Sequence, residues 1–171
     1  MSHIFRVSTI NGLLLAIYFV PTWMSAALKI VIFPLRGLYD RANIGPAIFV
    51  SDYFHLFALG TTRFAWLLAV AKLLVVAFFV VFALLTTTAW LRKSGEGDEA
   101  LVVALSLGSL ISFASMAVAA SVGESAAQHL HATETLMMIG GLVLLTMEAR
   151  RDADAIEALA VAHRIRFLHR I

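Results

Sequence analysis

An almost unbroken run of apolar residues between Phe64 and Leu91 constrains this chain more than any other feature. The run reads FAWLLAVAKLLVVAFFVVFALLTTTAWL and contains one charged residue, Lys72. As an α-helix it rises about 40 Å, which exceeds the ~30 Å thickness of the hydrocarbon core of a bilayer. Helices of soluble proteins keep a polar face, and this segment has none. The run therefore predicts an integral membrane protein.

The composition agrees with a membrane domain and leaves little room for a soluble one. Hydrophobic residues make up 61% of the 171-residue chain and charged residues 14%, whereas soluble domains average about 45–50% apolar and about 25% charged residues. The formal net charge of +2 gives no reason to expect a nucleic-acid partner, and a basic edge suits anionic lipid headgroups. The chain has no cysteine, which excludes disulfides, thiol redox chemistry and iron–sulfur clusters.

We expect an all-α fold with four membrane spans in one domain over residues 1–150. The predicted spans cover residues 8–34, 63–91, 100–122 and 125–149. The first contains Pro21, which favours a kink because proline removes one helical hydrogen bond. Its start looks like a signal peptide, but the apolar character continues past Lys29, so we expect an uncleaved helix. The fourth span has a rival reading as a shallow or re-entrant segment, because its first ten residues include Gln128, His129, His131 and Glu134.

The connections between these spans differ in length and character. A short polar turn at 94–99 joins the second and third spans, and a tighter turn at 121–125 makes the third and fourth spans an antiparallel hairpin. The longer connection at 36–62 holds an aromatic-rich stretch, 46–60, which is too short to cross and is expected to lie along the membrane interface. After the fourth span, residues 151–171 predict an amphipathic helix, with an apolar face of Ile156, Leu159, Ala160, His163 and Phe167. That helix either lies on the inner membrane surface or docks onto a partner subunit.

The distribution of lysine and arginine predicts the orientation in the membrane. With four spans, one side carries eight basic residues: Arg6, Arg92, Lys93, Arg150, Arg151, Arg164, Arg166 and Arg170. The other side carries three, namely Arg36, Arg41 and Arg63. Because basic residues collect on the cytoplasmic side, both termini are expected there. In a bacterium, this would be an inner-membrane protein with its C-terminal helix, 151–171, in the cytoplasm.

Lys72 and Glu134 are the charged residues expected deepest in the membrane. Counting from Arg63, Lys72 lies roughly 14 Å into the bilayer, and Glu134 lies at a matching depth in the fourth span. A cation at that depth normally snorkels, pairs or faces a wet cavity. We therefore expect a Lys72–Glu134 ion pair between the second and fourth spans, which either fixes helix register or belongs to an ion pathway.

Several histidines suggest a metal or haem site near the outer side. His129 and His131 point about 200° apart on a helix, so they do not chelate one metal together, whereas His131 and Glu134 share a face. His55, Asp52 and Glu124 are expected at the same level, and these ligand types suit zinc, copper or iron. Haem b with two histidine ligands requires His55 to face His129 or His131. The ordinary alternative is that these histidines bond to headgroups or neighbouring helices.

Small residues recur at spacings of three and four along the third span. They form one stripe, made of Ala104, Gly108, Ser112, Ser115, Ala119 and Gly123. Such stripes let helix backbones approach closely within a membrane, and Gly140 and Gly141 offer a matching notch in the fourth span. The second span differs, because large side chains surround it. Phe78, Phe79 and Phe82 are expected to face lipid by default, with a carotenoid-like ligand or large apolar partner helices as the alternatives.

No catalytic signature accompanies these features. GxSxG, HExxH, P-loop and GxGxxG motifs do not occur. The leading hypothesis is a non-catalytic membrane subunit that packs with other subunits or copies of itself in a larger complex, such as an energy-transducing one. The alternatives are a small transporter or ion pathway that uses Lys72 and Glu134, and a redox protein that binds haem b or a transition metal.

Overall fold

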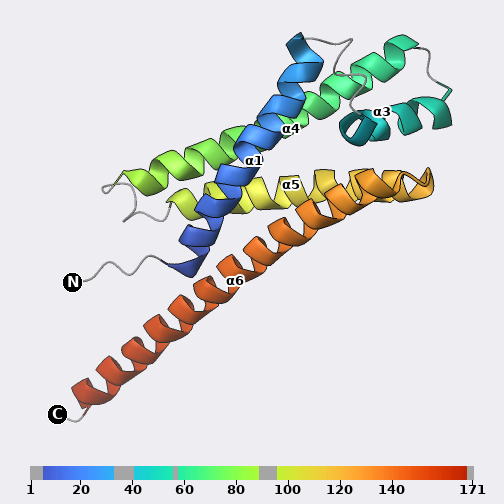
Figure 1. Cartoon of the computed structure of the whole chain (residues 1–171). Coiled ribbons are helices and arrows are strands. Elements are labelled where there is room, and N and C mark those ends of the chain that lie inside the picture. The colour runs from blue at the N-terminus through green and yellow to red at the C-terminus, as the bar shows by residue number, and fades with distance from the viewer. Residues whose placement is uncertain (1–5, 33–40, 56–57, 89–95, 169–171) are drawn as a thin grey trace.

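The described part of the chain folds as four long helices and one short one (Figure 1). The computed structural model describes residues 6–32, 41–55, 58–88 and 96–168, and describes side chains within 6–32, 44–55, 59–88 and 97–160. All elements in these ranges are helical: α1 (Val7–Ile32), α3 (Arg41–Tyr53), α4 (Ala58–Thr87), α5 (Glu96–Ser121) and α6 (Ser125–Leu168). Four of them, α1, α4, α5 and α6, are long and apolar enough to cross a membrane. This confirms the predicted class and the number of spans.

The helix boundaries differ from the predicted spans chiefly at the start of α4, at the start of α5, which is Glu96 and not residue 100, and at the end of α6. α4 begins at Ala58, five residues before the predicted start at Arg63, because the single glycine between them, Gly60, weakens a helix without ending it. The predicted ends of the first and second spans, residues 34 and 91, lie outside the described residues. Pro21 lies inside α1, which continues on both sides of it.

The larger difference concerns α6, which is a single helix of 44 residues. The predicted fourth span, 125–149, and the predicted C-terminal helix, 151–171, are joined without a break. No glycine or proline occurs between Met147 and Leu168, and the joining residues Glu148–Arg151 favour helix. The whole of α6 is about 66 Å long, twice the thickness of a bilayer core.

One end of the bundle brings together the beginning of α1, the beginning of α5 and the middle of α6. Arg6 donates to the carboxylate of Asp98, with Nη1 and Oδ2 3.0 Å apart, and also to the carboxylate of Asp152. The backbone N–H and the hydroxyl of Ser8 both donate to Glu148. These contacts place the three segments on one side, as an alternating path through four spans requires.

Gly123 ends α5 and does not belong to the packing stripe, so that part of the prediction is wrong. Its φ of +75° lies in the left-handed region, where a side chain is strained. The N–H of Gly123 donates to Ala120 O and the N–H of Glu124 donates to Ala119 O. This pair of bonds is a Schellman motif, in which glycine at the C′ position closes the helix and turns the chain. Gly123 is therefore needed for the turn into α6.

The other five stripe residues of α5 are buried: Ala104, Gly108, Ser112, Ser115 and Ala119. A Cβ atom added at Gly108 would contact the Sδ atom of Met138 on α6 and lie 2.9 Å from its Cε. α6 is therefore a partner of the stripe. Of the predicted notch against this stripe, Gly140 is exposed with nothing within 4 Å of an added Cβ, whereas a Cβ at Gly141 would lie 2.9 Å from Leu15 Cδ1 of α1 and 3.4 Å from Leu105 Cδ1 of α5.

The core is built from apolar side chains of α1, α4, α5 and α6. Phe79 and Phe82 of α4 are buried in it, at 0% and 1% exposure, so the prediction that they face lipid is wrong. Phe79 stacks on Phe19 of α1 with ring centroids 5.8 Å apart. A helix that is apolar on all sides carries no periodicity to separate its core face from its lipid face, which explains the error.

The short helix α3 packs beside the beginning of α4 (Figure 1). Ile44 and Ala47 of α3 are buried in a second apolar cluster with Ala27 and Ile30 of α1 and Ala65 of α4. The hydroxyls of Ser51 and Thr61 are also hydrogen-bonded. The aromatic-rich stretch thus begins as part of a helix that is folded back against the bundle.

Candidate functional site

A buried carboxylate, that of Glu134 on α6, is the centre of the most polar region inside the bundle. Three donors from three helices surround it. Trp23 Nε1 of α1 lies 2.8 Å from Oε1, and Ser112 Oγ of α5 lies 3.0 Å from Oε2. His131 Nδ1, one turn earlier on α6, lies 2.9 Å from Oε2. All three contacts are buried, so Glu134 links α1, α5 and α6 directly.

Lys72 adds the fourth long helix to this region. Its side chain is 2% exposed, and its ammonium group lies 5.4 Å from the centroid of the Trp23 ring, in the geometry of a cation–π contact. We call Trp23, Lys72, Ser112, His131 and Glu134 the buried polar cluster. The predicted direct Lys72–Glu134 ion pair stays a prediction, but both side chains belong to this cluster.

The local sequence explains how each side chain reaches the cluster. His131 and Glu134 are three residues apart and so lie on the same side of α6. Ser112 belongs to the stripe of α5 that packs against α6, where its hydroxyl replaces an apolar contact with a hydrogen bond. Trp23 follows Phe19 by four residues on the buried face of α1, and their ring centroids are 5.4 Å apart.

Burying these groups is tolerable only because they satisfy one another. An ionised carboxylate or ammonium removed from water loses several kcal/mol of solvation unless it is paired and hydrogen-bonded. Among the side chains that the structure describes, no buried nitrogen or oxygen lacks a partner. The arrangement is therefore suited to fixing the relative positions of four helices, and it also gathers three ionisable groups at one place.

Trp23 and Ser112 are the cluster members that the sequence analysis did not connect with Glu134. Ser112 was assigned only to packing, and Trp23 had no assigned role. A usable signal was present, because a tryptophan inside an apolar helix carries an N–H donor that needs a partner once it is buried. The nearest acceptor at a suitable depth is Glu134.

The histidines and the acidic residues of the outer end do not come together as a metal site. His131 is buried and bonded to Glu134, whereas His129 and His55 are exposed. Asp52 and Glu124 line a separate cavity of about 330 Å³ between α3 and the α5–α6 turn. Among the described residues, no three side chains of histidine, aspartate or glutamate are grouped so that they could hold a metal ion.

Comparisons with known proteins add no information on the site. No protein-family model matches this sequence, and neither a curated protein nor a solved structure shows significant similarity to it. The function is therefore inferred from the geometry of the buried polar cluster and of the helices.

Removing one charge of the buried polar cluster is expected to destabilise the fold, and removing both is expected to restore part of the loss. Lys72→Met leaves a buried carboxylate without its cation, which should lower the free energy of unfolding by about 3–5 kcal/mol. The Lys72→Met/Glu134→Gln double variant should be more stable than Lys72→Met alone. Thermal unfolding in detergent, followed by circular dichroism, measures both.

Lys29→Met is the matched control, because Lys29 is exposed near the end of α1. It should leave the unfolding temperature almost unchanged. If the Lys72 and Glu134 substitutions destabilise the protein additively, the two side chains do not act as a pair.

Proposed function

We propose that this chain is a non-catalytic integral membrane subunit that joins a larger assembly through the extension of α6. The continuity of α6 is the observation that carries the proposal. A span of about 20 residues is enough to cross a bilayer, and α6 has 44 residues without a break. Its last part therefore leaves the membrane along the direction of the span.

This direction favours docking over attachment to the membrane surface. A helix on the surface lies in the plane of the interface, so a chain that leaves a span must bend sharply to reach it. Sharp bends need proline, glycine pairs or a helix bulge, and none of these residues occurs between Met147 and Leu168. A straight extension presents its sides to other proteins instead.

The side chains of the extension are available for such contacts. Every residue from Ala149 to Ala160 is exposed. Ile156 and Leu159, which share one side of the helix, are 68% and 72% exposed. The other members of the predicted apolar face, His163 and Phe167, lie outside the described side chains. Exposed apolar residues on one side of a helix are typical of helix-in-groove contacts.

The interior of the bundle supports a packing role in the same way. The five buried small residues of α5 and the buried polar cluster are both used in contacts between the four helices. We propose an inner-membrane location with both ends in the cytoplasm, which follows from the excess of basic residues on that side. The exposed Tyr53 and Phe54 at the end of α3 support a place at the opposite interface, where aromatic rings are favoured.

The assembly is tested by purification from native membranes in a mild detergent. The chain should elute with other subunits, or with further copies of itself, in a fixed ratio measured by mass spectrometry. Ile156→Glu/Leu159→Glu should release it, because two carboxylates would be buried in the contact. Ala158→Glu is the control, since Ala158 lies on the opposite side of the helix. Isolation of the unaltered chain as a single monomer would contradict the proposal.

The orientation is tested with single cysteines, for which the cysteine-free chain is a ready background. Ser121→Cys, in the exposed α5–α6 turn, should react with a membrane-impermeant maleimide in intact cells. Ala155→Cys, in the exposed extension, should react only after the membrane is permeabilised. The reverse pattern would show that the termini face outward.

A second candidate function is an ion or proton pathway, and the burial of three ionisable side chains together favours it. Lys72, His131 and Glu134 are at most 5% exposed, and ionisable residues inside membranes often mark such pathways. Reconstituted protein should then carry protons into liposomes, and Glu134→Gln should abolish the flux while Glu157→Gln, on the exposed extension, preserves it. Flux no greater than that of empty liposomes would rule this function out.

A further inference from the structure

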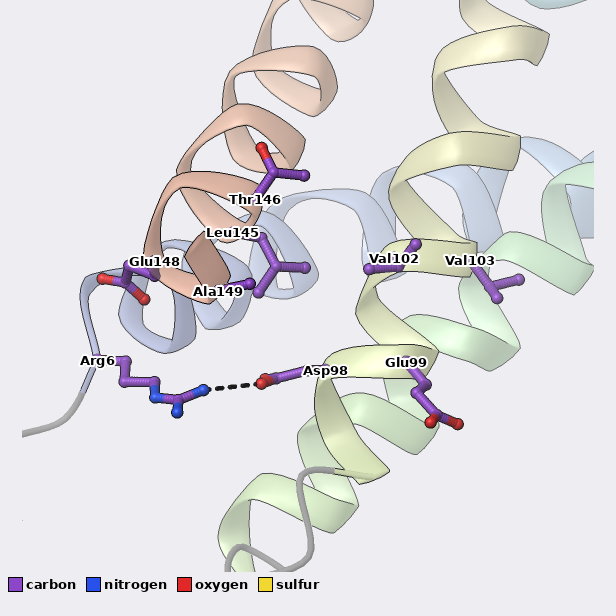
Figure 2. A pocket seen from close by; sticks show the side chains of 9 residues that line it. All are labelled: Arg6, Asp98, Glu99, Val102, Val103, Leu145, Thr146, Glu148 and Ala149. Atoms are coloured by element: carbon purple, nitrogen blue, oxygen red, sulfur yellow. Dashed lines mark hydrogen bonds and ion pairs between the residues drawn. The ribbon is translucent and has the colours of Figure 1, made fainter. Parts of the chain in front are cut away.

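A cavity of about 350 Å³ lies between α5 and α6, at the end of the bundle where α1 begins. The two helices meet at their shared turn and diverge toward this end (Figure 1). Figure 2 shows the cavity in close view, with Leu145 of α6 and Val102 of α5 directed toward the space between the helices. Val103 and Ala149 complete its apolar lining. Ligand pockets have volumes of about 300–1,000 Å³, so this cavity has room for part of an apolar molecule.

The polar edge of the same cavity is acidic. Its charged lining residues are three carboxylates, Asp98, Glu99 and Glu148, and one guanidinium, Arg6, which leaves a formal charge of −2. Arg6 bonds to Asp98 across the gap between the helices (Figure 2). It also bonds to Asp152, a fourth carboxylate. Glu148 accepts hydrogen bonds from Ser8, and Figure 2 shows the Glu99 carboxylate directed away from Arg6. A ligand at this edge therefore contacts Arg6 and Asp98 directly, within an excess of negative charge.

The position of the cavity indicates that its ligand comes from the bilayer. Three of its apolar side chains, Val102, Val103 and Leu145, lie about one helical turn inside the acidic edge, on the parts of α5 and α6 that are apolar enough to span a membrane. A molecule that fits must have a hydrocarbon part at that depth and a polar part at the level of Arg6 and Asp98. Bilayer phospholipids have this form and surround the protein at high concentration.

We infer that this cavity binds a membrane phospholipid with a primary-ammonium headgroup. A primary ammonium has three N–H donors for the carboxylates at the edge, whereas a quaternary choline group has none. A headgroup with net negative charge is disfavoured by the excess of carboxylates. Arg6 is half exposed, at 51%, and two of its five N–H donors are used by Asp98 and Asp152. The others suit the phosphate of the lipid.

This inference does not depend on the proposed assembly function. A bound lipid of this kind would occupy the space between the diverging ends of α5 and α6 whether or not a partner subunit is present. The two proposals therefore fail separately, because one is read from copurifying proteins and the other from bound lipids.

The test uses the full chain in nanodiscs made from equal parts of phosphatidylethanolamine, phosphatidylcholine and phosphatidylglycerol. Native mass spectrometry then identifies the lipid that stays bound when the disc is removed. Phosphatidylethanolamine should be retained about two- to fivefold more than phosphatidylcholine, the range expected for a partly exposed charged contact. Equal retention of these two lipids, or a preference for phosphatidylglycerol, would overturn the inference.

Two variants with matched controls locate the bound lipid. Val102→Phe fills the cavity and should abolish the preference, while Leu110→Phe, on an exposed side of α5, should preserve it. Glu99→Gln removes one carboxylate from the edge without disturbing a buried residue and should reduce the preference, while Glu157→Gln should not. Retention of the full preference by both Val102→Phe and Glu99→Gln would show that the lipid binds elsewhere.

Discussion

The contacts of the Glu134 carboxylate are the interaction on which the arrangement of the four long helices depends. Apolar helices in a bilayer have little hydrophobic reason to prefer one neighbour or one register, since lipid tails are as apolar as leucine. Hydrogen bonds to Glu134 come from Trp23 on α1, Ser112 on α5 and His131 on α6. A shift of any of these helices by one turn, about 5.4 Å, would break a buried contact. The cluster therefore specifies one arrangement among several that apolar packing would allow.

Close packing of small residues makes this polar arrangement geometrically possible. Gly108 and Gly141 lie where a side chain would meet Met138 and Leu15, respectively, so α5 and α6, and α6 and α1, approach more closely than larger residues would permit. Ser112 lies one turn after Gly108 on the same stripe, and this proximity brings its hydroxyl to the carboxylate. The close approach of the α5 and α6 backbones and the hydrogen bond from Ser112 to Glu134 thus depend on the same stripe of α5.

The sequence was most informative for properties that depend on a whole segment, such as its length and its apolar content. Bilayer thickness and the apolar content of each segment were sufficient for the class and the four spans, and the spacing of small residues identified the buried side of α5. It was least informative for α4, where apolar residues on all sides hide the buried positions of Phe79 and Phe82. The continuity of α6 was missed because charged residues after Met147 were read as the end of one helix, although charge alone does not stop a helix.

The candidate site was predictable only in part, for a similar reason. The rise per residue of a helix is nearly constant, so counting residues predicted that the charged side chains of Lys72 and Glu134 lie at the same depth and close together. The depth of a residue does not tell which side of its helix faces the interior of the bundle. This rotation of α6 about its axis makes His131 buried and leaves His129 exposed. The buried N–H donor of Trp23 was a signal that the sequence already carried, whereas the role of Ser112 needed the packed structure, since it arises from the contact of α5 with Glu134.

The unbroken length of α6 also has a mechanical consequence. Glu134 lies near the beginning of this helix, and about 50 Å of continuous helix follow it to Leu168. A rigid rod held near one end converts a small rotation into a large displacement at the other, so a tilt of about 5° at Glu134 would move the far end by about 4 Å. Small changes in packing around Glu134 are thereby transmitted, enlarged, to the far end of α6.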